Sequence, residues 1–154
     1  MADYSFRDAA ERAAANIEAP KPLPAGMWRF AVRGGSLKEI TGRGDKAPIW
    51  EASYPLKVIA PVENVSEDEL EAYGDYSEAN NCFYSIPGWR KDDEWKVVRF
   101  HTETLQQEVD GLSLAELPQS ADGYEFVAEV SHRFYGDDNS DVAADIKNAT
   151  RIEF

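Results

Sequence analysis

The sequence is poor in the residues that build cross-linked or metal-held scaffolds. Its 154 residues include one cysteine and two histidines, which excludes an internal disulfide and argues against a structural zinc site. No apolar run approaches the roughly 18 residues that a membrane-spanning helix needs. The first 20 residues, MADYSFRDAAERAAANIEAP, lack the apolar stretch of a secretory signal. We therefore expect a cytoplasmic protein that is not attached to a membrane.

The sequence also lacks the motifs of common catalytic sites. It contains no HExxH, Gly-x-Ser-x-Gly, CxxC or kinase signature. His132 alternates onto the apolar side of a predicted strand, which favours a partly buried, hydrogen-bonded histidine over a catalytic one. Cys82 stands in the apolar string CFYSI, which favours a buried thiol over a nucleophile. The acidic segments SEDELE and GDDNSD read as solvated surface rather than Mg²⁺ or Ca²⁺ sites. We expect no enzymatic activity, no metal and no cofactor.

Basic residues are few, but they are concentrated. The formal net charge is −13, which opposes nucleic-acid binding because phosphate contacts depend on Lys and Arg. Residues 21–60, however, hold seven basic and three acidic residues, whereas residues 61–80 hold seven acidic residues and no basic one. With 43% hydrophobic residues, the chain suits one folded domain with a core. The sequence thus predicts one positive region on an otherwise acidic surface.

Residues 1–25 are predicted to form an N-terminal arm, and residues 26–154 the domain. The segment APKPLPAG ends any preceding helix, so a short helix is expected over Phe6 to Ile17. Alternating apolar and polar residues then predict a strand over 27–40, bent at Gly34-Gly35, and a second over 49–62, where Pro55 indicates an edge or a bulge.

The rest of the domain is predicted to contain one main helix and three more strands. Ser66 and Glu69 form a capping-box pattern for a short acidic helix, and Ser113 with Glu116 repeats it. Strands are predicted over 80–88, 123–136 and 142–154. A helix is predicted from Asp92 on, and its apolar positions recur at spacings of three and four: Trp95, Val98, Thr102, Leu105 and Val109.

This order of elements is that of the OB-fold. We therefore predict a mainly β chain, folded as a five-stranded OB-like Greek-key barrel with a helix between strands 3 and 4. A β-sandwich with a peripheral helix is the alternative. The core is predicted to include Trp28, Phe30, Trp50, Tyr54, Trp95 and Phe126, together with the Tyr124 to Val130 side of the fourth strand.

Basic and aromatic residues alternate outside this predicted core. Proteins that bind single-stranded nucleic acid combine a positive groove with aromatic rings on which bases stack. The loop TGRGDKAP is interpreted either as a plain hairpin connection or as a mobile basic loop that closes over a nucleic-acid backbone. The predicted contacts are Arg29, Arg33, Arg43, Lys46, Lys57, Trp89, Arg90, Lys91, Arg133 and Tyr135.

The chain resembles bacteriophage-type single-stranded DNA-binding proteins of the OB-fold class. The resemblance is carried by PLPAGMWRFAV, by DDEWKVVRFHTETLQQEV followed by LAELPQSADGYEFVAEVSHRFYG, and by the ending ADIKNATRIEF, and it covers most of residues 20–154. It implies a protein of the host cytoplasm that coats exposed strands in DNA replication, recombination or repair, without sequence preference, catalysis or cofactor. Single-stranded DNA is the implied partner; replication or recombination proteins and further copies of the chain are left open.

The ending departs from that family's pattern. Many members carry an acidic tail that ends in Phe and recruits partners; here Phe154 is preceded by Lys147 and Arg151. A closing strand explains the ending as well as a tail does. The alternative function is a viral OB-like or β-sandwich module that binds proteins through its acidic surface, as an inhibitor or an assembly component.

Overall fold

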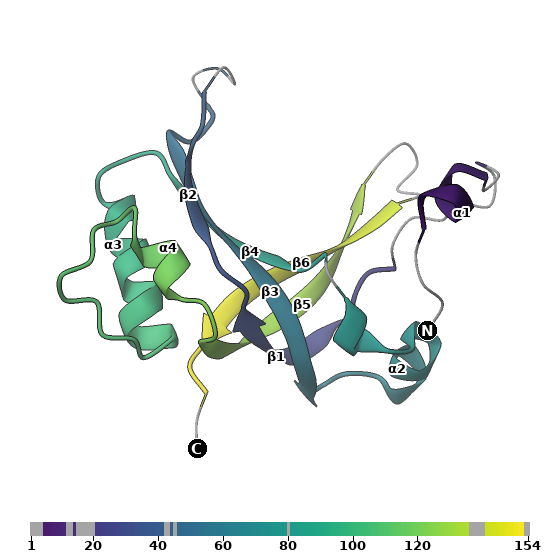
Figure 1. Cartoon of the computed structure of the whole chain (residues 1–154). Coiled ribbons are helices and arrows are strands. Elements are labelled where there is room, and N and C mark those ends of the chain that lie inside the picture. The colour runs from purple at the N-terminus through teal and green to yellow at the C-terminus, as the bar shows by residue number, and fades with distance from the viewer. Residues whose placement is uncertain are drawn as a thin grey trace.

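A computed structural model describes residues 5–11, 14, 21–41, 44, 46–79, 81–135 and 141–152. These residues form a mainly β structure with six strands in one antiparallel sheet and four α-helices (Figure 1). The strands are β1 (Gly26–Val32), β2 (Ser36–Glu39), β3 (Trp50–Glu63), β4 (Phe83–Gly88), β5 (Glu125–Tyr135) and β6 (Asp141–Thr150). The helices are α1 (Phe6–Glu11), α2 (Glu67–Tyr73), α3 (Asp93–Arg99) and α4 (Leu117–Ser120). A 3₁₀ turn spans Tyr76–Glu78, and a π-helical turn, Phe100–Thr104, continues α3.

The first predicted strand is bent, as expected, and its halves are β1 and β2. Gly34 has a φ of 77°, which favours glycine. A Cβ on Gly35 would lie 2.5 Å from the carbonyl oxygen of Pro118, so only glycine fits there without a shift of the backbone. Because of this bend, β3 pairs with β2 through residues 50–53 and with β1 through residues 56–63.

The strand β3 is central rather than an edge strand, which corrects one interpretation of Pro55. β3 has β1 and β2 on one side and β4 on the other. Pro55 lies where β3 changes partner from β2 to β1, and its carbonyl accepts a 2.8 Å hydrogen bond from the N–H of Arg33. Its missing N–H therefore falls where the neighbouring strand is bent, which is a position that tolerates proline.

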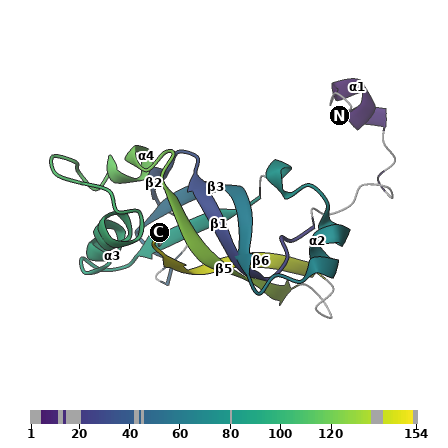
Figure 2. The same ribbon diagram turned by 90° about the horizontal axis from the view of Figure 1, so that it is seen from below.

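A free edge remains along β4. The strand order is β2-β3-β1-β5-β6, with β4 paired to β3 alone. The predicted helix does lie between the third and fourth predicted strands, but the sheet is not closed into a barrel: no ladder of hydrogen bonds joins β4 to β6 within the described residues. Figures 1 and 2 show α3 and α4 together at one end of the sheet and α2 at the other.

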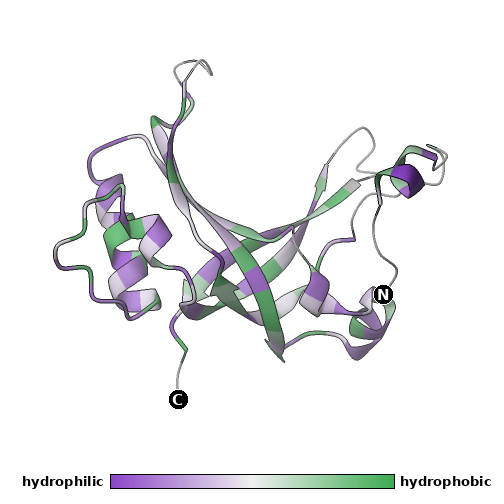
Figure 3. Ribbon diagram, viewed as in Figure 1, coloured by the Kyte–Doolittle hydropathy of each residue, from purple (hydrophilic) through white to green (hydrophobic). Residues whose placement is uncertain are grey.

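The core lies on one face of the strands, where apolar residues alternate with polar ones (Figure 3). Trp28 is fully buried, and its indole N–H donates to the carbonyl of Pro24 at 2.8 Å. Leu23 is also fully buried, so the end of the predicted arm packs on the core. Cys82 is buried as predicted, and burial raises the pKa of its thiol to about 11. The predicted core positions that are buried are Trp28, Phe30, Tyr54, Phe126, Ala128 and Val130, whereas Trp50 is partly buried and Tyr124 is exposed.

The prediction that Trp95 is a core residue is wrong, since 60% of this residue is exposed. Helix α3 instead buries Val97, and the π-helical turn that follows buries Phe100 and His101. A π turn contains one more residue than an α-helical turn. Residues before the turn are therefore rotated relative to those after it, and a buried stripe predicted at regular α-helical spacing does not continue across it. The helical segment also ends at Thr104, before Val109.

A buried polar network links the π turn to the sheet. Nε2 of His101 lies 2.8 Å from the hydroxyl of Tyr54, Nδ1 lies 2.7 Å from Oε1 of Gln107, and the Gln107 amide donates to Oγ of Ser120 at 2.7 Å. Every donor in this network meets an acceptor when His101 is neutral, with the Tyr54 hydroxyl donating to Nε2 and the Nδ1–H group donating to Oε1 of Gln107. Burial lowers the pKa of His101, and the hydrogen bond to Gln107 offsets part of this effect.

We expect this network to make folding sensitive to mild acid. The unfolded chain binds a proton at His101 near about pH 6.5, whereas the folded chain does so only at lower pH, so stability is lost as the pH falls below about 6.5. Urea unfolding at about pH 7.5 and about pH 5.5 measures the loss. His101→Gln should cost about 1–3 kcal/mol at the higher pH and reduce the pH dependence. Equal stability of the wild type at both pH values would contradict the assignment.

Candidate nucleic-acid interface

Four of the predicted contact residues lie together, where the β2–β3 loop meets the start of α3. The indole N–H of Trp89 donates to the backbone carbonyl of Lys46 at 3.0 Å. Arg90 and Lys91 follow in the turn that leads into α3, and their side chains, like that of Lys46, are exposed. Trp89 is 47% exposed. The structure thus combines three cations and one accessible aromatic ring in one place, here called the Trp89 cluster.

A buried carboxylate holds this turn. Asp93, at the start of α3, accepts hydrogen bonds from the N–H groups of Trp89 at 2.8 Å and Arg90 at 3.0 Å. Its other oxygen lies 2.9 Å from Nζ of Lys96. Lys96 and then the two backbone N–H groups keep the pKa of Asp93 well below its usual range. The sequence thereby fixes the Trp89 cluster through a capping carboxylate that is charged at neutral pH.

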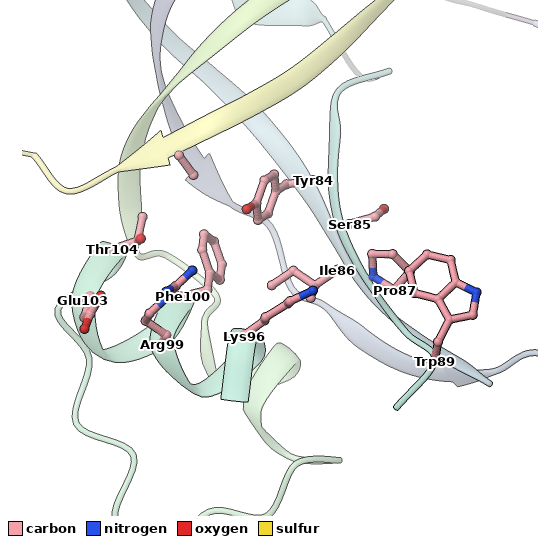
Figure 4. A pocket seen from close by; sticks show the side chains of 11 residues that line it. Tyr84, Ser85, Ile86, Pro87, Trp89, Lys96, Arg99, Phe100, Glu103 and Thr104 are labelled. Atoms are coloured by element: carbon pink, nitrogen blue, oxygen red, sulfur yellow. The ribbon is translucent and has the colours of Figure 1, made fainter. Parts of the chain in front are cut away.

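The outer face of β2, β3 and β4, opposite the core, continues from the Trp89 cluster. Residues on this face lie opposite one another in the strand register and so form rows across the strands. The rows are Lys38, Glu51 and Pro87; Ser36, Ser53 and Ser85; and Pro55 with Phe83. Phe83 is 53% exposed. Figure 4 shows Pro87 and Trp89 side by side, on the side of β4 away from Phe100. Accessible rings therefore stand at both ends of the β4 part of this face.

Two more predicted contacts, Arg33 and Lys57, lie on the same outer face. Arg33 is held opposite Pro55 by its backbone hydrogen bond, and Lys57 is the register partner of Ala31. Both side chains are exposed, and both neighbour the row of Pro55 and Phe83. These two cations lie near Phe83, at the start of β4. The Trp89 cluster lies at the other end of β4.

Three predicted contacts lie apart from this face or are already paired. Arg29 Nε is 2.6 Å from Oε1 of Glu125, so a neighbouring carboxylate offsets its charge. Arg133 and Tyr135 belong to the β5–β6 hairpin, where Arg133 lies 3.2 Å from Asp145 and 6.0 Å from the centre of the Tyr135 ring. Figure 1 shows the β2–β3 and β5–β6 hairpins rising on opposite sides of β4. Arg43 lies outside the described residues.

Sequence reasoning missed four residues of this region. Phe83 and Lys38 lie on the outer face, and Lys96 and Arg99 lie on α3 beside β4. Strict alternation would have found Phe83, since Cys82 and Ile86 are buried and Phe83 points the other way. The cations of α3 are one turn apart, but only the fold shows that they face β4.

Many of the acidic side chains that the structure describes lie away from this face. Exposed carboxylates gather on α2 and the 3₁₀ turn after it: Glu67, Asp68, Glu69, Glu71, Asp75 and Glu78. In α2 they stabilise the first turn, where the helix dipole favours negative charge and Ser66 accepts from the N–H of Glu69 at 3.4 Å. On the outer face, Glu51 stands opposite Lys38.

No protein-family model and no curated protein matches the sequence. Every helix in the described part of the chain is too short or too polar to cross a lipid bilayer. The same residues contain no group of three or more His, Cys, Asp or Glu side chains placed to hold a metal ion. The candidate interface therefore rests on the geometry of the side chains described above.

We expect Asp93→Ala to loosen the Trp89 cluster. The change removes the acceptor of two backbone N–H groups and the partner of Lys96, so thermal unfolding should begin at lower temperature and the emission of Trp89 should shift towards that of a solvated indole. Asp92→Ala is the matched control, since Asp92 is exposed and its side chain caps no N–H. The stability difference between wild type and Asp93→Ala should shrink as the pH falls below about 4, where the carboxylate becomes protonated in the unfolded chain. Equal effects of the two substitutions would contradict the capping role.

Proposed function

We propose that the chain is an OB-like domain that binds single-stranded DNA without sequence preference in viral DNA replication, recombination or repair. The observation that carries the proposal is the outer face of β3 and β4, where accessible rings, hydroxyl groups and cations follow one another. The strand pairing supports the OB-like part: counted with β1 and β2 as one bent strand, the sheet pairs the first strand with the second and fourth, the second with the third, and the fourth with the fifth.

The side chains on this face suit a flexible strand better than a duplex. Cations at the Trp89 cluster and at Arg33 and Lys57 would meet phosphates, and the rings of Trp89 and Phe83 would stack on bases, which every base allows. The seven residues from Phe83 to Trp89 span roughly 20 Å in extended chain, which is room for several nucleotides. Phosphate contacts and stacking carry no sequence information, so binding without sequence preference follows.

The net charge does not prevent such binding. Exposed charges are screened over about 8–10 Å at physiological salt, and the carboxylates of α2 lie at the end of the sheet opposite α3 (Figure 2). A strand on the outer face meets Arg33, Lys57 and the Trp89 cluster at close range. The more distant acidic side then acts mainly on the approach of the DNA rather than on the bound complex.

A second candidate is a viral module that binds proteins through its acidic surface. It is favoured by the exposed carboxylates of α2 and the turn after it, because residues 61–80 contain no basic residue to neutralise them. Such a surface would bind a basic partner. Failure to bind single-stranded DNA at low salt would favour this candidate.

Binding should be strongest to single strands and should weaken with salt. We expect a fluorescent oligo-dT to bind more tightly than a duplex of equal length, with log K falling linearly against log salt. The double variant Lys46→Gln, Lys57→Gln should flatten that slope by about 0.7 per cation. Lys21→Gln, which removes the same charge beside α2, should leave the slope unchanged. No binding at low salt would exclude the proposed function.

Stacking should depend on two rings of the outer face. We expect Trp89→Ala or Phe83→Ala to weaken oligo-dT binding about tenfold or more, since each stacked base contributes roughly 1–3 kcal/mol. Trp95→Ala is the matched control, because Trp95 is more exposed than Trp89 but lies on α3. Fluorescence anisotropy measures all three affinities. Equal losses for Trp89→Ala and Trp95→Ala would remove the stacking assignment.

A further inference from the structure

A hollow of about 450 Å³ lies along the free edge of β4, where the sheet is open (Figure 4). Its size is within the range of small-ligand sites. Two rings lie side by side in its wall, since the centroids of Tyr84 and Phe100 are 4.8 Å apart and their planes are tilted by 32°. Ala149 of β6 completes the wall opposite β4. Tyr84 is partly exposed, whereas Phe100 is 4% exposed and packs behind it. The hollow thus has an aromatic wall in which Tyr84 is the ring that a planar group could contact.

Two cations stand at this hollow. Lys96 and Arg99, one helical turn apart on α3, both line it. Lys96 is shared with Asp93, whereas Arg99 forms no ion pair with any carboxylate of the described residues. Glu103 is the one carboxylate among the lining residues that the structure describes. Arg99 is therefore the cation at the hollow that is available to an anionic group.

The backbone of β4 adds polar groups but does not suit a peptide strand. The N–H of Leu56 bonds to the carbonyl of Cys82, and in an antiparallel ladder this pattern alternates. Tyr84 and Ile86 therefore turn their backbone groups towards β3, and Ser85 and Pro87 turn theirs towards the free edge. Proline has no N–H, and a short edge that contains proline resists addition of another strand.

The hollow is also lined by a π-helical turn. Phe100 and Thr104 belong to the π-helical turn, and such turns are rare and often lie at functional sites. An aromatic wall, two cations and the polar backbone groups at the free edge of β4 suit a planar ring attached to an anion.

We propose that this hollow holds one nucleotide of the bound strand, with its base against Tyr84, which packs on Phe100, and its phosphate at Lys96 and Arg99. The inference rests on the proposed function and deepens it, because it adds a partly open site for a single nucleotide that shares Ser85, Pro87 and Trp89 with the outer face. Base and phosphate are recognised by contacts that do not depend on base identity.

Deoxyadenosine 5′-monophosphate tests the site without the rest of the strand. Titration followed by amide chemical shifts should perturb Ser85, Thr104 and Ala149. Arg99→Gln should weaken binding about tenfold, the effect of losing one charge-assisted hydrogen bond. Glu103→Gln should strengthen binding, since it removes the nearby negative charge. Lys21→Gln is the control, because it removes one charge beside α2, away from the hollow, and should leave binding unchanged. Ala149→Leu should block the site by filling it.

The outcomes separate this inference from the proposed function. Oligo-dT binding without any shift from the mononucleotide at about 10 mM, or equal effects of Arg99→Gln and Lys21→Gln, would overturn the nucleotide site and leave the proposed function intact. Equal shifts with inorganic phosphate or with an acidic peptide would overturn it as well. Mononucleotide binding in a chain that does not bind oligo-dT would overturn the assignment to a DNA strand together with the proposed function.

Discussion

The partner exchange of β3 is the constraint on which the structure depends. One 14-residue strand pairs with β2 along one half and with β1 along the other, and this requires the chain between β1 and β2 to bend. Gly34 and Gly35 supply the bend, and Gly35 brings the backbone against Pro118 of α4. From α4, Ser120 holds Gln107 and so His101, which returns to β3 through Tyr54. The bend, α4 and the π turn are therefore one packed unit.

The same exchange shapes the two surfaces that carry the functional proposals. Because β3 stays extended past the bend, its outer residues align with β2 on one side and β4 on the other, which produces the row Ser36, Ser53 and Ser85. Because β4 pairs with β3 alone, its other edge borders the hollow beside α3. Strand β4 thus borders both surfaces, with Phe83 on the outer face and the ring of Tyr84 in the wall of the hollow.

The features that could be predicted from the sequence are those that depend on local residue patterns. Alternation located the strands and most of the buried residues, because side-chain direction in a strand has a period of two wherever the strand pairs. It also predicted the bend, because glycine pairs interrupt strands. It did not predict the exposure of Trp95, since a π turn depends on how Phe100 and His101 pack in the core. Nor did it show that Arg29 meets Glu125, 96 positions later, because such pairs are set by register.

For the proposed DNA binding, the placement of charge matters more than its sum. An acidic chain gains little from long-range attraction to DNA, so most of its affinity has to come from contacts at short range. Stacking on Phe83 and Trp89 is such a contact, and it is insensitive to salt compared with phosphate binding. Glu125 and Asp145 each form an ion pair with a cation that lies off the outer face, so these cations are less available to phosphate groups. On this proposal, the DNA strand would follow the cations that have no such partner, and the remaining acidic surface would repel it elsewhere.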